Sequence, residues 1–202
     1  MENKKPILAE VNYFNISRQQ ILESIEKNNG TLIVSGILLS ANMVNQNGRY
    51  YPRPILEREF TKYNSMVKGN AALGELDHPD STVVNLKNVS HKIIEMHWDD
   101  NDIVGTVEIL STPSGNILKE LFKGGVKVGI SSRGLGSVKE SEKEPGQVVV
   151  QDDYELIGWD FVSNPSNQGS WMHIVESAGM TSKPVYKYAK LETIITKILC
   201  GE

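Results

Sequence analysis

The stretch "GGVKVGISSRGLGSVKE", residues 124–140, decides how the rest of the chain is interpreted. Its aliphatic residues alternate, which predicts a β-strand with one face toward the core. Ser132 shares that apolar face, whereas Ser131 falls on the opposite one. Gly129 lies on the same face as Ser131 and leaves room for another backbone to approach. The alternation therefore makes Ser131 the candidate nucleophile of the serine pair.

The residues after the serine pair allow two interpretations. Together with Ser132, the residues Arg133, Gly134 and Gly136 can form a bend whose backbone N–H groups bind an oxyanion. Serine and glycine are also common where a strand simply ends in a turn. The segment lacks the Gly-Lys-Ser/Thr order of a phosphate-binding loop, and we expect no cofactor.

Composition excludes several classes of protein. The chain has 202 residues and a net charge of −4, without a basic stripe that would bind nucleic acid. Its single cysteine, Cys200, rules out an internal disulfide framework and a cysteine zinc cluster. No apolar run is long enough to span a bilayer, and the start, "MENKKPILAE", lacks the apolar core of a signal peptide. These features predict a soluble protein of a reducing compartment.

The order of apolar runs and turns predicts an α+β fold. Many short strands and few helices, without repeated strand–helix units, favour a mainly antiparallel β core with a few flanking helices. We expect one domain over residues 1–176 and a tail over residues 177–202, whose place in the molecule is open. Helices are expected at residues 17–29, 54–66 and 111–123, and strands at 31–41, 70–76, 89–98, 102–110, 126–132, 147–151 and 153–163.

A serine nucleophile needs a base, and His78 is the best placed of the four histidines. It lies in "GELDHPD", after a short strand and before a proline that restricts the loop. It could equally be a histidine of a surface loop. Asp77, His78 and Asp80 could also bind a metal, but loop ligands at this spacing without a second histidine are a weak signal, and we expect no metal.

A third group should orient the histidine, and Asp160 is the candidate. In "YELIGWDFVSNPSNQ" it shares a strand face with apolar residues. A carboxylate on an apolar face is costly unless it is paired, and an imidazole is a suitable partner. An aspartate on an edge strand, or one that caps the following turn, remains an alternative.

Together these segments resemble the prohead core proteases of tailed phages, of the T-even type. The resemblance covers about residues 32–172 and rests on four segments in order: "VNQNGRYYPRPIL", "ALGELDHP", "GGVKVGISSRGLGS" and "GWDFVSNPS". It implies a serine endopeptidase with a fold related to herpesvirus assemblin. It places the catalytic histidine at His78 and the nucleophile at Ser131. The third member stays open: Asp160 is preferred, while His91 or His97 would match the second histidine of the herpesvirus enzymes.

The resemblance also implies where the protein acts and on what. It predicts cleavage of scaffold or core proteins and of capsid-protein propeptides, after glutamate, inside an immature capsid assembled in the host cytoplasm. Glu23 and Glu176 lie in segments of the expected cleavage type, so self-processing is a further expectation. We expect no nucleic-acid or membrane partner, and the oligomeric state, homo-oligomers included, stays open. The rival interpretation is a structural prohead component with the same fold and no activity.

Overall fold

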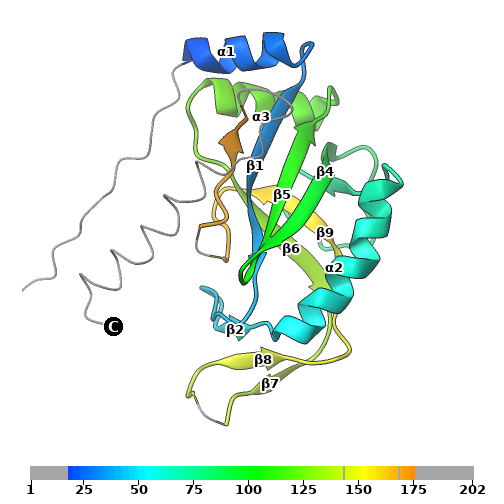
Figure 1. Ribbon diagram of the computed structural model, residues 1–202, viewed down its shortest axis with the longest axis vertical. Helices are drawn as coiled ribbons and strands as arrows, with labels where there is room; N and C mark the ends of the chain where they lie inside the picture. Colours follow the sequence, from blue (N-terminus) through cyan, green and yellow to red (C-terminus); the bar gives the residue numbers. More distant parts are fainter. Residues whose placement is uncertain (1–17, 143, 168, 176–202) are drawn as a thin grey trace, which may run out of the picture.

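The computed structural model describes residues 18–142, 144–167 and 169–175 (Figure 1). The predicted tail, Glu176 and Cys200 lie outside these residues, so the division at residue 176 stays a prediction. The elements in chain order are α1 (Arg18–Lys27), β1 (Leu32–Ser40), β2 (Arg49–Tyr50), α2 (Arg53–Lys68), β3 (Leu73–Glu75), β4 (Val89–Asp99), β5 (Asp102–Ile109), α3 (Pro113–Lys123), β6 (Gly129–Leu135), β7 (Val138–Glu140), β8 (Val148–Val150), β9 (Glu155–Val162) and β10 (His173–Ile174).

The largest sheet is antiparallel and has the strand order β10-β1-β5-β4-β3. Its strand β1 is buried along its whole length, and the neighbouring β5 buries its apolar residues while its polar ones are partly exposed. The strand β1 is "LIVSGILLS", whose β-branched and aliphatic residues favour a strand that is covered on both faces. Two smaller sheets, β2-β8-β7 and β6-β9, complete the fold.

The β6–β9 ribbon closes the large sheet into a barrel-like circuit. At one edge Leu76, next to β3, forms a parallel bridge with Phe161 of β9. At the other edge Gly129 of β6 bridges Trp171, just before β10, and Ile130 N–H donates to the carbonyl of Ser170 at 2.9 Å. Because both ends of the ribbon are bonded, β6 and β9 are fixed relative to β3 and β10.

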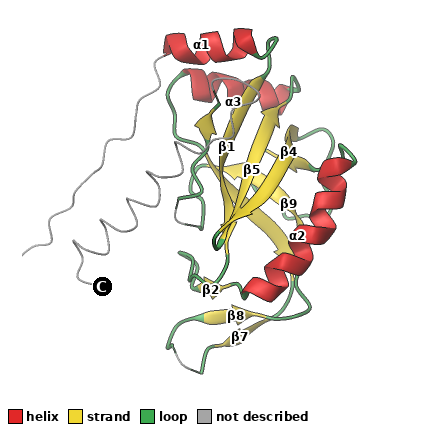
Figure 2. Cartoon of the chain, viewed as in Figure 1, coloured by secondary structure: helices red, strands yellow, loops and turns green. Residues whose placement is uncertain are grey.

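Helices cover the outside of this circuit (Figure 2). α1 and α3 lie together at one end of the sheet, and the small β7–β8 hairpin lies at the opposite end (Figure 1). α2 packs on β4 and β9 and buries Ile55, Leu56 and Tyr63. The Tyr63 ring meets the buried Trp159 ring edge-on, with centroids 4.7 Å apart.

The predicted α+β class with mainly antiparallel sheets is confirmed. One local expectation is wrong. The glycine-rich bend expected after Ser131 is strand, because β6 continues to Leu135 and stays paired with β9. Gly134 is explained by packing instead, since a Cβ there would lie 2.6 Å from the Tyr154 ring.

No helix in the described part of the chain is both long and apolar enough to cross a membrane.

Candidate active site

The β6–β9 ribbon places Ser131 directly opposite Asp160. Partners that face each other in an antiparallel pair project from the same side of the ribbon, with Cα atoms about 4.5–5.5 Å apart. Both side chains are buried: Asp160 is 0% and Ser131 is 6% exposed. The register therefore brings a carboxylate beside the candidate nucleophile, although 28 positions of sequence lie between them.

His78 reaches the same place from the loop after β3. Its Nδ1 lies 2.8 Å from Asp160 Oδ2, and its side chain is 40% exposed. The backbone before it is fixed on β9, since Asp77 N–H donates to the Phe161 carbonyl at 2.8 Å. Asp77 has a φ of 64°, a left-handed conformation that aspartate tolerates better than most residues. The turn thus directs the imidazole back onto the ribbon.

Asp160 is held in its ionised form. Burial raises its pKa, but hydrogen bonds from His78, from Glu75 N–H and from Arg133 outweigh burial and leave the pKa below its ordinary value. An ionised carboxylate only accepts hydrogen bonds, so His78 Nδ1 must carry a hydrogen and donate it. In the neutral imidazole, Nε2 is then left with a lone pair. That is the tautomer a general base requires.

Arg133 does not have the side-chain role that the sequence suggested. Its side chain is 8% exposed and makes four hydrogen bonds inside the protein. Nε donates to Asp160 Oδ2 at 2.8 Å, Nη2 to Asp160 Oδ1 and Glu75 Oε1 at 3.1 Å each, and Nη1 to the Ser81 carbonyl at 2.6 Å. The side chain is therefore committed to buried carboxylates and is not free to bind an oxyanion.

Ser132 lies on the other face of β6, as its alternation predicts. Its hydroxyl lies near those of Tyr51 and Tyr154, whose pKa values are raised by burial. Its backbone N–H has a different position. Ile130 N–H points away from β9 and donates to the Ser170 carbonyl. Because backbone N–H groups alternate between the two edges of a strand, Ser132 N–H also points away from β9, past the hydrogen bond between Ile130 and Ser170.

Ser166 is a neighbour of Ser131 that no sequence motif singled out. Its Oγ lies 3.5 Å from Ser131 Oγ, and its carbonyl accepts from Gln46 N–H at 2.8 Å. The preceding Pro165 packs over Gly129, where an added Cβ would come within 2.5 Å of the ring. Within the described part of the chain, no hydrogen bond links Ser131 to His78.

The other histidines do not contact His78 through a hydrogen bond in the described residues. His91 is fully buried between Ser90 Oγ at 2.9 Å and the Trp159 carbonyl at 3.1 Å. Burial lowers the pKa of His91 to about 4, against the opposing effect of Asp160. His97 is exposed on β4. The geometry thus favours Asp160 as the partner of His78.

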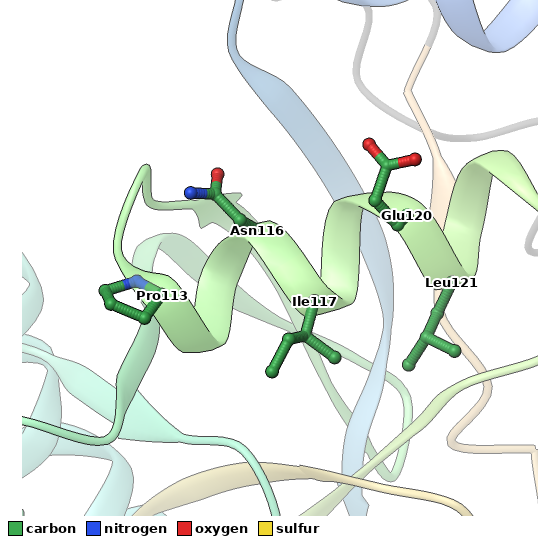
Figure 3. A pocket seen from close by; sticks show the side chains of 5 residues that line it. All are labelled: Pro113, Asn116, Ile117, Glu120 and Leu121. Atoms are coloured by element: carbon green, nitrogen blue, oxygen red, sulfur yellow. The ribbon is translucent and has the colours of Figure 1, made fainter.

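Two further features bear on other kinds of site. Across the described ranges, no three His, Cys, Asp or Glu residues form a group that could hold a metal ion, and this includes the residues around Asp77 and Asp80. A hollow of about 490 Å³ lies against α3, away from the ribbon (Figure 3). Its lining residues are Pro113, Asn116, Ile117, Glu120 and Leu121, none of which belongs to the His78 group.

Comparison with known proteins agrees with these observations. Residues 19–180 match the model of a family described as prohead core protein serine protease. The prohead core protein protease of Enterobacteria phage T4 is 34% identical over 145 residues, which is 70% of this chain and 68% of that protein. A solved structure of the bacteriophage T4 capsid assembly protease, gp21, aligns with a TM-score of 0.61 and 33% identity, and covers 67% of this chain and 84% of the other.

Proposed function

Because the chain belongs to the prohead core protein serine protease family, we propose that it is a serine endopeptidase whose site is Ser131, His78 and Asp160. One observation carries the assignment: Asp160 shares a ribbon face with Ser131 and binds His78 Nδ1 at 2.8 Å. This arrangement supports the assignment of a serine triad to one face of β6 and β9.

The reaction is acyl transfer. His78 Nε2 takes the proton of Ser131 Oγ while Oγ attacks the carbonyl carbon of the peptide, and His78 then gives that proton to the leaving amine. Water repeats the sequence and releases the acid and free Ser131. Asp160 fixes the imidazole tautomer and offsets the charge of the imidazolium. Ser131 Oγ lies 3.5 Å from Ser166 Oγ, and proton transfer requires Ser131 Oγ and His78 Nε2 to come within hydrogen-bond reach.

The oxyanion needs a donor other than the Arg133 side chain. Ser132 N–H is suited to this role because it follows the nucleophile and points to the outer edge of β6, away from β9. Gly134 follows the shift in β6–β9 register after Arg133 and belongs to an exposed segment that a substrate backbone can approach. We propose that the backbone N–H groups of Ser132 and Gly134 bind the oxyanion and the substrate backbone.

The family description and the T4 relative indicate the substrates. We propose scaffold or core proteins and capsid-protein propeptides, cut after glutamate inside the immature capsid in the host cell. Self-processing is part of the proposal at Glu176, which lies outside the described residues. At Glu23 it is less suited to the folded chain, because Glu23 is in α1 and Ser24 is buried, and endopeptidases bind extended segments.

A fluorophosphonate probe tests this proposal directly. The reagent phosphonylates an activated serine, and we expect peptide mass spectrometry to find the added mass on Ser131. Ser131→Ala should abolish labelling and lower cleavage of a scaffold substrate by at least about 10⁴-fold. Ser132→Ala keeps its backbone N–H and should retain most activity. Normal cleavage by Ser131→Ala would overturn the assignment, and no labelling in the folded chain would favour the structural prohead component.

A further inference from the structure

Glu75 is a second buried carboxylate at the site, and the mechanism above gives it no role. Its side chain is 0% exposed, and its Oε1 accepts from Arg133 Nη2 at 3.1 Å. The same Nη2 donates to Asp160 Oδ1, also at 3.1 Å. One guanidinium therefore bridges Glu75 and Asp160. Glu75 also reaches Asp160 through its backbone, since its N–H donates to Oδ1 at 3.0 Å.

The same two side chains anchor the loop that follows His78. Arg133 Nη1 donates to the Ser81 carbonyl at 2.6 Å, and Glu75 Oε1 accepts from Asn85 N–H at 3.0 Å. The residues of this loop are mostly exposed, so these bonds are its main attachments to the buried interior. The charge cluster of Glu75, Arg133 and Asp160 thus fixes His78 in two ways. Asp160 holds the imidazole ring, and the hydrogen bonds to Ser81 and Asn85 hold the chain that follows His78.

The charges of the cluster explain why Arg133 needs a second carboxylate. Arg133 alone would neutralise Asp160 and leave no net negative charge for an imidazolium. Counted in their ionised forms, Glu75, Asp160 and Arg133 carry a formal net charge of −1 beside His78. A charge within about 4–6 Å acts strongly on a neighbouring ionisable group, and more so in a buried setting.

We propose that Glu75 is a positioning residue, which offsets Arg133 so that the negative charge of Asp160 remains available to the imidazolium of His78. This inference rests on the proposed protease function and adds a residue to it. Glu75 acts through Arg133 and Asp160 and does not touch the substrate.

The other ionisable groups around the cluster are neutral or exposed. From β4, His91 faces Asp160, and burial lowers its pKa to about 4, so it is uncharged at neutral pH. From α2, Tyr63 faces Asp160 and Arg133, and burial raises its pKa. On the loop of His78 itself, Asp77 and Asp80 are exposed, and solvent screens their charges.

The test is an NMR titration of His78, which needs no catalysis. It is recorded in the Ser131→Ala background, so the result is separate from the proposed activity. Glu75→Gln should lower the midpoint of the His78 titration by roughly 0.5–1 pH unit, because Arg133 then cancels Asp160. Arg133→Gln should move the midpoint in the opposite direction. Glu59→Gln, which removes another buried carboxylate held by cations, should leave it unchanged.

A double variant covers the case in which Glu75→Gln alone does not fold. The double variant Glu75→Gln/Arg133→Gln keeps the net charge of −1 on Asp160, so its midpoint should equal or exceed that of the parent. A folded Glu75→Gln protein whose midpoint stays within about 0.2 unit of the parent, or a double variant with a lower midpoint, would overturn the role of Glu75.

In the active enzyme the same change has a kinetic signature. Glu75→Gln should lower kcat about 10-fold with KM within roughly threefold, and shift the acidic limb of the pH–rate profile to lower pH. A purely structural role would lower the amount of folded enzyme without moving that limb. If Ser131 proved not to be the nucleophile, the NMR shift would still report on Glu75, so the two proposals fail separately.

Discussion

The strand β9 is held near each end by a buried carboxylate, and the two differ in what their partners can do. Near its start, Glu59 of α2 accepts from Leu156 N–H at 3.0 Å, from Arg58 at 2.8 Å and from Lys62 at 2.9 Å. Toward its end, Asp160 accepts from Glu75 N–H, Arg133 and His78. Hydrogen bonds outweigh the effect of burial and lower the pKa of both carboxylates.

The difference lies in the cations. Arg58 and Lys62 reach Glu59 from solvent, with side chains 37% and 58% exposed. Arg133 is buried, and beside it lies the His78 imidazole, a group that serves as a proton acceptor and donor in catalysis and whose side chain is 40% exposed. A buried, paired carboxylate is therefore no sign of catalysis by itself. Its partner must be able to take and release a proton where a substrate can reach it.

The largest expected effect distinguishes the two carboxylates by activity. Asp160→Asn should lower kcat about 10⁴-fold, because the amide can donate to Nδ1 and favour the wrong imidazole tautomer. The measurement is steady-state cleavage of a peptide substrate at neutral pH. Glu59→Gln, the matched change near the other end of β9, should keep kcat within about threefold. Equal losses in the two variants would mean that Asp160 only supports the strand.

The next effect concerns stability at the Asp160 end. His91 is neutral when folded, with a pKa of about 4, whereas the unfolded chain protonates near pH 6.5. The unfolded state therefore binds more protons between these values, and stability should fall by up to about 3 kcal/mol as the pH drops from 6.5 to 4. Urea denaturation across this range measures the loss.

A His91→Gln variant serves as its control. The glutamine amide can still donate to the Trp159 carbonyl but does not titrate, so the slope over this pH range should decrease. Burial also lowers the pKa of His173, which contributes in the same direction. The difference between the two proteins isolates His91, and an unchanged slope would contradict the prediction.

The smallest effect concerns the Glu59 end. Glu59→Gln should lower the free energy of unfolding by about 2 kcal/mol, because a charged acceptor of Leu156 N–H and of two cations is lost. Lys62→Met should cost less than about 0.5 kcal/mol, since an exposed ammonium contributes little. Urea midpoints at neutral pH give both values. A loss for Lys62→Met as large as that for Glu59→Gln would mean that the Glu59 end depends on its exposed cation.

Much of the fold follows from local pattern. Apolar and β-branched runs located β1, β4, β5 and β9, and the segment "STPSGNILKELFKGG", which ends at Gly124-Gly125, located α3. The strand β7 and the end of β6 were missed, because Gly134 and Gly136 read as a bend. Gly134 and Gly136 instead leave room for Tyr154, which packs closely against both. Tyr154 lies about 20 positions further along the sequence, so no local pattern could reveal this contact.

The sequence by itself determined the fold class, the family resemblance and the face of β6 on which Ser131 lies, because these depend on residues close in the chain. Only the tertiary structure decided which groups meet. The β6–β9 register set Asp160 opposite Ser131, and the turn at Asp77 brought His78 onto that carboxylate. The same packing buried Arg133 between Asp160 and Glu75. Strand register and the closure of the barrel-like circuit depend on residues far apart in sequence. For this reason the sequence suggested that Arg133 binds the oxyanion, whereas in the structure Arg133 pairs with Asp160 and Glu75.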